Sequence, residues 1–300
     1  MRPTWTGIYP AITTKFHENG ELDITTFVKS IEFQINSGVS GIIIGGSLGE
    51  SSTLRADEKI DLIKALQPYR DKVPVITNIA ESSTKRAIEA AIAAENNGAD
   101  GLMLLPPLLY KADADETVQY FKDIADSTSL PILLYNNPVD YKIEITIQMF
   151  EKLVDVKNIE AVKESTRDLT NITRMRNAFG DRYKIMGGVD TICLESLLMG
   201  ADGLVAGLVC AFPKETVVLY NLAKAGRIDE AVNLYRWFMP LLEMDIHPKL
   251  VQYIKLAEVY TGIGTENVRQ PRQKISGEER IRIIAILEHA LRNRPDLQSF

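Results

Sequence analysis

Short apolar segments alternate with amphipathic segments along the first two thirds of the chain. The apolar segments are six to nine residues long, which suits strands, and their apolar character is nearly continuous rather than alternating. They are IYPAIT (8–13), SGIIIGG (40–46), VPVITNIA (73–80), DGLMLLPP (100–107), LPILLYNNP (130–138), IEAVKE (159–164), YKIMGG (183–188) and DGLVAG (202–207). Strands of this kind are typical of a parallel sheet buried on both faces.

The segments between these strands have the period of amphipathic helices. The clearest are DITTFVKSIEFQI (23–35), ADEKIDLIKALQPY (56–69), STKRAIEAAIAAEN (83–96) and DETVQYFKDIAD (115–126). A short phrase also recurs before three strands, as SGVSG (37–41), NGADG (97–101) and MGADG (199–203). It predicts a helix that ends at a left-handed glycine, namely Gly38, Gly98 or Gly200, followed by a tight turn and a strand.

The repeated strand–helix unit predicts the fold class. Eight strands with helices between them suit a (β/α)8 TIM barrel of class α/β better than a doubly wound sheet, which usually has about six strands. After the eighth apolar segment the pattern is helical only, through KETVVLYNLAKAG, IDEAVNLYRWFMPLLEMD, KLVQYIKLAEVYTG and GEERIRIIAILEHALRN. We therefore expect a catalytic barrel over residues 1–225 and a C-terminal helical region, packed on it, over residues 226–300.

Composition narrows the function without changing the fold. Of the 300 residues 45% are apolar and 25% charged, as in ordinary globular proteins, so the chain can form a large core. The net charge of -6, with no long run of either sign, argues against nucleic acid as a partner. No apolar run approaches the 18 or so residues of a membrane span, and the first residues do not resemble a signal peptide, so we expect a cytoplasmic protein.

Metal-ligating and disulfide-forming residues are scarce. The only cysteines are Cys193 and Cys210, and the three histidines, His17, His247 and His289, are widely separated. A histidine-rich metal site and a histidine-centred catalytic relay therefore have little material, and a reducing compartment is expected. We therefore do not expect a histidine-rich metal site.

In such a barrel the functional residues follow the carboxyl ends of the strands. Lys163 ends the sixth segment, where burial would favour its neutral form and make it a candidate nucleophile toward a carbonyl or an imine. An ion pair with Glu164 or Glu160 is the equally weighted structural alternative. Tyr135 ends the fifth segment before the stiffening Pro138, and its phenol could move protons to and from a Schiff base, or could simply be a tyrosine at the rim of the core.

The segment GGSLGE (45–50) follows the second strand. Glycines there allow a sharp turn that presents backbone N–H groups, with the Ser47 hydroxyl, to a substrate carboxylate. The same letters satisfy G-x-S-x-G, the nucleophile elbow of serine hydrolases. That alternative needs a helix immediately after the serine, whereas SSTLRAD intervenes, so we give it little weight.

Two further loops follow the seventh and eighth strands. Gly188 and Val189 belong to the first and Gly207 to the second, and in barrels these loops often bind phosphate. No basic residue lies within either short loop, so a phosphorylated substrate is disfavoured. The glycines could instead let a substrate approach the backbone, or could serve only as turn residues.

Taken together, GSLGE (46–50), YNNP (135–138), AVKES (161–165) and GGVD (187–190) resemble the dihydrodipicolinate synthase and N-acetylneuraminate lyase family of Schiff-base class I aldolases. The resemblance implies a homotetramer built as a dimer of dimers and no cofactor. It implies that Lys163 forms the imine with a 2-oxo acid or a cyclic imino acid, and that Tyr135 moves protons. Ser47, as the third catalytic residue, and the N–H of Leu48 would hold the carboxylate. The further substrate-binding residues expected are Gly46, Gly49, Asp140, Gly188, Val189 and Gly207.

Three departures from the family pattern concern the substrate. Leu48 replaces a second hydroxyl residue of the carboxylate loop. Where the synthases have an arginine after the loop proline, this chain has Val139 and Asp140, and an aspartate would repel a second carboxylate. Leu108 and Leu109 stand where the synthases have a tyrosine that reaches across the dimer, so the proton relay would end at Ser47, Tyr110 or water. Condensation as in the lysine pathway is therefore disfavoured.

Further phrases resemble the narrower 1-pyrroline-4-hydroxy-2-carboxylate deaminase branch of bacterial hydroxyproline catabolism. They are AGLVCAFPKETV, YRWFMPLL, LVQYIKLAEV and SGEER, together with GSLGE and VKES. This resemblance implies dehydration and deamination to 2-oxoglutarate semialdehyde and ammonia. The alternatives are an aldolase or dehydratase of a sugar-derived 2-oxo acid, and a catalytically silent sensor of such an acid.

Overall fold

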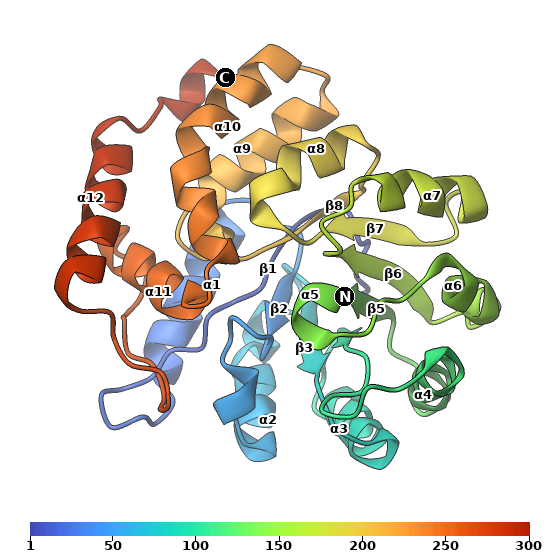
Figure 1. The fold of residues 1–300 in the computed structure, drawn as a ribbon. Helices are drawn as coiled ribbons and strands as arrows, with labels where there is room; N and C mark the ends of the chain where they lie inside the picture. The colour runs from blue at the N-terminus through green and yellow to red at the C-terminus, as the bar shows by residue number, and fades with distance from the viewer.

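Eight parallel strands form a single sheet that curves into a barrel in the computed structural model, which describes residues 1–300 except the side chain of Ser299 (Figure 1). The strands are β1 (Gly7–Pro10), β2 (Ile42–Ile44), β3 (Val75–Ile79), β4 (Gly101–Leu104), β5 (Ile132–Asn136), β6 (Ile159–Glu164), β7 (Lys184–Gly187) and β8 (Gly203–Ala206). Each pairs with its neighbour in the order β1-β8-β7-β6-β5-β4-β3-β2, and a bridge between Ala11 and Ile43 brings β1 back to β2. The predicted (β/α)8 fold is confirmed.

Helices follow the strands, and all except the short α5, which lies over the barrel mouth, form the outer layer (Figure 1). They are α1 (Ile24–Asn36), α2 (Ala56–Ala65), α3 (Thr84–Asn96), α4 (Ala114–Asp126), α5 (Pro138–Tyr141), α6 (Ile147–Leu153), α7 (Thr170–Phe179), α8 (Cys193–Leu198) and α9 (Pro213–Lys224). Side-chain caps fix several starts: Asp23 accepts from the N–H of Thr26, and Asp113 and Glu116 form a capping box on α4. The turn glycines Gly38, Gly98 and Gly200 have φ values of 90°, 89° and 105°, as the recurring phrase predicts.

The strand register places the candidate catalytic residues side by side. Tyr135 on β5 pairs with Lys163 on β6, and Lys163 pairs in turn with Met186 on β7. Below them the barrel interior is filled by apolar side chains that include Ile43, Ile76 and Leu133. The barrel is therefore a packed core that leaves space only at the carboxyl ends of its strands.

The chain after α9 folds as three longer helices and a 3-10 turn. These are α10 (Ile228–Leu242), the turn η5 (Glu243–Ile246), α11 (Leu250–Tyr260) and α12 (Gly277–Arg292), which lie together along one side of the barrel (Figure 1). Within the described residues, no helix is both long enough and apolar enough to cross a membrane.

Two buried ion pairs hold α11 against the barrel. Lys255 donates to Glu50 at 2.5 Å, and Lys15 donates to Glu258 at 2.6 Å, with all four side chains at most 1% exposed. Glu258 also accepts from the Thr13 hydroxyl at 2.8 and 2.9 Å. Charges so deeply buried are tolerated only when paired and hydrogen-bonded, so these contacts fix the position of α11.

Candidate active site

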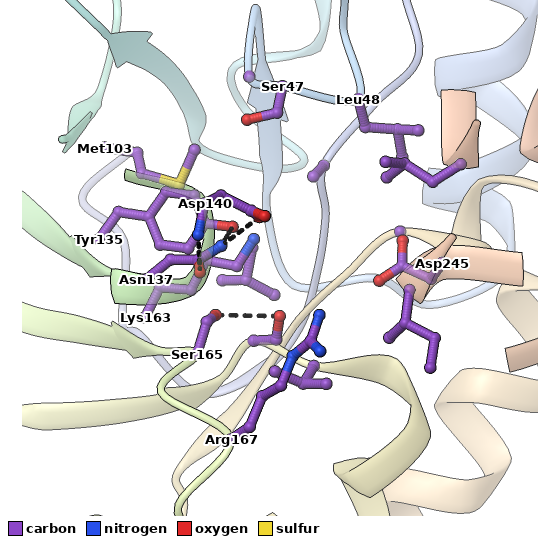
Figure 2. Close-up of a pocket in the computed structure, with 18 residues that line it drawn as sticks. Ser47, Leu48, Met103, Tyr135, Asn137, Asp140, Lys163, Ser165, Arg167 and Asp245 are labelled. Atoms are coloured by element: carbon purple, nitrogen blue, oxygen red, sulfur yellow. Dashed lines mark hydrogen bonds between the residues drawn. The ribbon is translucent and has the colours of Figure 1, made fainter. Parts of the chain in front are cut away.

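A cavity of about 100 Å³ opens at the carboxyl ends of the strands. The polar side chains that line it come from the loops after β2, β5 and β6 and from the C-terminal turn η5 (Figure 2); they are Ser47, Tyr135, Asn137, Asp140, Lys163, Ser165, Arg167 and Asp245. The remaining lining residues, including Gly46, Leu48, Gly188, Val189 and Gly207, are apolar or glycine. A small cavity of this kind suits a small molecule with a few polar groups.

Lys163 lines the cavity and is its candidate nucleophile. Its side chain is buried at the end of β6, and its Nζ lies 4.2 Å from the centroid of the Tyr135 ring. Burial lowers the pKa of Lys163 below the ordinary lysine value, although Asp245 and Tyr141 act in the opposite direction. The amine is thereby shifted toward the neutral form that attacks carbonyl or imine carbon.

The predicted structural alternative for Lys163, an ion pair with a neighbouring glutamate, is wrong. Glu160 instead accepts from Arg2 and, at 3.0 Å, from the indole of Trp5. Glu164 accepts from Asn171 at 2.7 Å and from the backbone N–H of Thr166 at 2.8 Å. Among the described residues Lys163 therefore has no carboxylate in direct contact.

Tyr135 is held in the site by its own loop. Asn137 donates from Nδ2 to the Tyr135 hydroxyl at 3.0 Å and to Asp140 at 2.8 Å. Burial raises the pKa of Tyr135, so the phenol stays protonated. Asp140 lines the mouth of the cavity, where it could repel a second substrate carboxylate as the sequence predicts.

Tyr141 completes a hydroxyl chain that sequence reasoning assigned elsewhere. Tyr141 lies on the four-residue helix α5. Its ring packs edge-on against the Tyr135 ring, with 5.5 Å between the ring centroids, and its hydroxyl shares a hydrogen bond with the Ser47 hydroxyl. Burial raises the pKa of Tyr141 to about 12. Of the three ends predicted for the proton relay, Tyr110 lies outside the cavity, where its exposed hydroxyl donates to Glu116 at 3.0 Å. Tyr135 and Ser47 thus line the cavity, and Tyr141 of the same chain contacts both of them.

Glu50 fixes the position of the loop 45–50, which is predicted to bind the substrate carboxylate. This residue is fully buried in the left-handed conformation, with φ 57°, and it accepts from Lys255 at 2.5 Å and from the N–H of Arg269 at 3.0 Å. The N–H of Leu48 donates to no acceptor within the described residues and lies at the cavity. It is available to an anionic ligand.

Two of the predicted glycines make room for side chains. A Cβ on Gly188 would lie 2.6 Å from Cγ and 2.7 Å from Cε of Lys163, and a Cβ on Gly207 would lie 1.9 Å from a carboxylate oxygen of Asp245. Gly49 does not line the cavity, because it packs against the carbonyl oxygen of Ile12, where a Cβ would come within 2.9 Å.

Asp190 and Asp245 form an acidic pair, of which Asp245 lines the cavity opposite Tyr135 (Figure 2). Asp190 accepts from the N–H of Leu208 at 2.8 Å and from the N–H of Gly207 at 3.1 Å. Asp245, from η5, faces the cavity and has no hydrogen-bond or ion-pair partner within the described residues. Arg167, with φ 66°, points to the same mouth and is likewise unpaired in the part of the chain described (Figure 2).

Three of these residues escape sequence reasoning to different degrees. Arg167 follows Lys163 by four positions and lies within the loop after a strand, where a barrel is searched for function. Tyr141 lies just after the YNNP segment, but on a helix too short to show a period. Asp245 carries no signal, since it lies in a helical region of the chain with no strand before it.

The arrangement does not suit a serine hydrolase. The helix α2 begins only at Ala56, well after Ser47, and no histidine lines the cavity among the described residues. Within the same residues no group of three or more histidine, cysteine, aspartate or glutamate side chains is placed to hold a metal ion.

Comparison with known proteins places this site in a family. The profile described as Dihydrodipicolinate synthetase family matches residues 4–290. A 4-hydroxy-tetrahydrodipicolinate synthase of Geotalea uraniireducens is 31% identical over 94% of this chain and 97% of its own length. The crystal structure of dihydrodipicolinate synthase from Aquifex aeolicus is 26% identical with a TM-score of 0.90, covering 95% of this chain and 97% of that one. The 4-hydroxy-tetrahydrodipicolinate synthase structure from Methylacidiphilum fumariolicum is 28% identical with a TM-score of 0.92, covering 98% of both chains.

Proposed function

The chain belongs to the dihydrodipicolinate synthetase family, and we propose that within it the protein is a deaminase of 1-pyrroline-4-hydroxy-2-carboxylate. The family places it among the lyases of the class I aldolase superfamily, whose characteristic mechanism uses a lysine Schiff base. The observation that carries the proposal is the buried Lys163 amine, unpaired by any carboxylate in the described residues and set beside Tyr135 in the cavity.

In the proposed reaction Lys163 adds to C2 of the cyclic imine, and opening of the ring leaves a lysine Schiff base and a free amine on C5. The substrate carboxylate lies against Ser47 and the N–H of Leu48. Tyr135 gives its phenol proton to the departing ring nitrogen and, as the phenolate, takes a proton from C3. Tyr141 and Ser47 continue the proton path. The enamine so formed expels the C4 hydroxyl, because the Schiff base at C2 accepts and returns the electron pair.

Proton transfers then move the unsaturation to the C5 nitrogen, which becomes an imine. Hydrolysis at C5 releases ammonia, and hydrolysis at C2 frees Lys163. Overall one substrate and one water give 2-oxoglutarate semialdehyde and ammonia, since the water lost at C4 offsets one of the two consumed. The ring opening, the loss of the C3 proton and the loss of the C4 hydroxyl therefore all depend on the Lys163 nitrogen.

The names of the relatives favour a second function, the synthase-type condensation. Two features of this chain argue against it. The mouth of the cavity carries Asp140, and a carboxylate facing the cavity disfavours a substrate with a second carboxylate. Leu48 removes one hydroxyl from the carboxylate loop.

Incubation of the purified protein with 1-pyrroline-4-hydroxy-2-carboxylate tests the proposal. We expect stoichiometric ammonia and semialdehyde, measured by a coupled dehydrogenase assay and by mass spectrometry. The same assay with pyruvate and aspartate semialdehyde, and with sugar-derived 2-oxo acids, provides the comparison. Turnover of one of those substrates without ammonia release from the pyrroline would replace the proposal by condensation or by sugar-acid cleavage.

A catalytically silent sensor would behave differently from all of these enzymes. Borohydride reduction in the presence of pyruvate should add the mass of the reduced adduct to Lys163 if the lysine is reactive. Absence of the adduct, together with measurable pyruvate binding, would favour the sensor. The predicted homotetramer is tested separately by analytical ultracentrifugation.

A further inference from the structure

We propose that Asp245 is the general acid that protonates the departing C4 hydroxyl of the substrate. The inference rests on the proposed deaminase function and adds a residue from outside the barrel strands to its chemistry. The elimination step needs such a group, because hydroxide is a poor leaving group and leaves readily only as water. Neither Tyr135 nor Ser47 is placed to supply that proton, since both lie on the side from which C3 is deprotonated.

The position of Asp245 fits the part of the substrate that extends away from Lys163. With C2 bonded to Nζ and the carboxylate at the Leu48 N–H, the ring atoms C3 and C4 occupy the space between Tyr135 and Asp245. Figure 2 shows the Asp245 carboxylate directed into this space from the wall opposite Tyr135. C3 thus faces the phenol and C4 faces the carboxyl.

The hydrogen bonds of the acidic pair indicate which member carries a proton. Asp190 is held by the N–H groups of Gly207 and Leu208, which stabilise a negative charge. Asp245 receives no hydrogen bond from the described residues. When two nearby carboxyls differ in this way, the one that receives no hydrogen bond is the acid.

The electrostatic surroundings of Asp245 agree with this assignment. Burial, and then the negative charge of Asp190, raise the pKa of Asp245 well above the ordinary aspartate value. Lys163, and more weakly Arg167, act in the opposite direction. Once Lys163 has become part of an extended Schiff base, the protonated Asp245 faces the leaving group across the cavity.

The proposed step balances. The enamine electron pair forms the C3–C4 double bond, the C4–O bond breaks, and the oxygen leaves as water with the proton of Asp245. The Asp245 carboxylate then takes a proton from C5, which restores the acid and begins the transfer of unsaturation to the C5 nitrogen. One carboxyl thereby serves C4 and C5 in turn.

Gly207 supports the assignment independently of charge. A methyl group at this position would lie 1.9 Å from an Asp245 carboxylate oxygen, so the glycine permits the carboxyl to reach the cavity. The Gly207 backbone, at φ -101° and ψ -52°, is accessible to alanine. Gly207→Ala therefore displaces Asp245 without changing the charge or straining the main chain.

The test compares the natural substrate with its 4-chloro analogue, whose chloride leaves without a proton. Asp245→Asn should lower ammonia release from the hydroxyl substrate about 10²- to 10⁴-fold, the usual contribution of a general acid, and should change release from the chloro substrate less than about tenfold. Gly207→Ala should show the same pattern. Glu243→Gln, an exposed change in the same turn, should leave both rates unchanged.

Pyruvate adduct formation at Lys163 measures whether the variants fold and bind. It should be retained in Asp245→Asn and Gly207→Ala. Equal losses with the hydroxyl and chloro substrates, or no loss at all, would overturn the role of Asp245 while leaving the deaminase intact. Failure of the unmodified protein to release ammonia from either substrate would overturn the proposed function itself, and the role of Asp245 with it.

Discussion

The two walls of the cavity are built in different ways. One wall consists of strand ends and their loops, and it carries Lys163, Tyr135 and Ser47. The other carries Asp245, Ile246 and Leu250, which come from the turn η5 and the start of α11. The first wall is positioned by the hydrogen-bond ladder of the sheet, and the second by α11 and its buried ion pairs. In the proposed mechanism the first wall forms the covalent bond to the substrate, as expected throughout the family. The second wall contributes the residues that select the substrate.

Replacing the amine of the first wall should have the largest effect. Lys163→Ala should lower ammonia release by at least about 10⁴-fold, because loss of a covalent nucleophile leaves only binding and electrostatics to act. Borohydride with pyruvate should leave the variant unlabelled. Lys157→Ala, an exposed change near the other end of the strand, serves as the control and should be labelled normally. Normal turnover by Lys163→Ala would remove the basis of the mechanism.

Breaking the anchor of the second wall should come next. Lys255→Met leaves the fully buried Glu50 carboxylate with only the guanidinium of Arg272, 3.8 Å away, as a cation. The free energy of unfolding should therefore fall by about 3 kcal/mol in equilibrium urea unfolding. Adding Glu50→Gln should recover part of this loss. The exposed pair of Lys152 with Asp115 provides the contrast, since Lys152→Met should change stability by about 0–1 kcal/mol. Equal effects at the two sites would mean that the second wall is held by other contacts.

Removing one hydroxyl from the first wall should have a smaller effect on rate. Tyr141→Phe breaks the hydrogen bond to Ser47 and should slow exchange of the pyruvate methyl protons with deuterated solvent about 10²-fold. Labelling of Lys163 should persist, because the amine is untouched. Tyr110→Phe, whose hydroxyl lies outside the cavity, should exchange at the normal rate. A normal exchange rate in Tyr141→Phe would show that Tyr135 passes its proton elsewhere.

The smallest effect concerns the pH at which the first wall becomes reactive. The neutral amine forms the imine, and its fraction rises with pH through the pKa of Lys163. Since burial lowers that pKa, the rate of pyruvate labelling should reach half its maximum below the ordinary lysine value of 10.5. Asp140, Asp190, Asp245 and Tyr141 all face the amine and oppose the shift without reversing it. A midpoint at or above 10.5 would contradict the proposed reactivity.

The first wall could be predicted from the sequence because its residues end apolar strand segments. The eight segments are the eight strands, and strand order alone brings Tyr135 beside Lys163. The purpose of Gly188 was less accessible, since only the structure shows that the Lys163 side chain occupies the space that its missing Cβ leaves. The pattern of apolar segments thus predicts which residues lie at strand ends, but it does not predict every contact between them.

The second wall could not be predicted, for reasons that are equally physical. Asp245 lies in a 3-10 turn between two helices. The periodicity of a helix predicts which of its faces is buried, but not which cavity a side chain in the following turn reaches. The pairing of Lys255 with Glu50 joins residues 205 positions apart, a separation at which no sequence pattern specifies contact. Tyr141 was missed because a four-residue helix has no period to detect.

The bond between Glu50 and Lys255 also bears on synthesis of the protein. All eight strands have been translated once residue 206 leaves the ribosome. Glu50, however, gains its partners only when residues 255, 269 and 272 have emerged. A chain arrested between these points would have its reactive lysine in a nearly finished barrel and an unpaired buried charge under the loop. Activity is thus expected to arise last during biogenesis, after the strands have assembled.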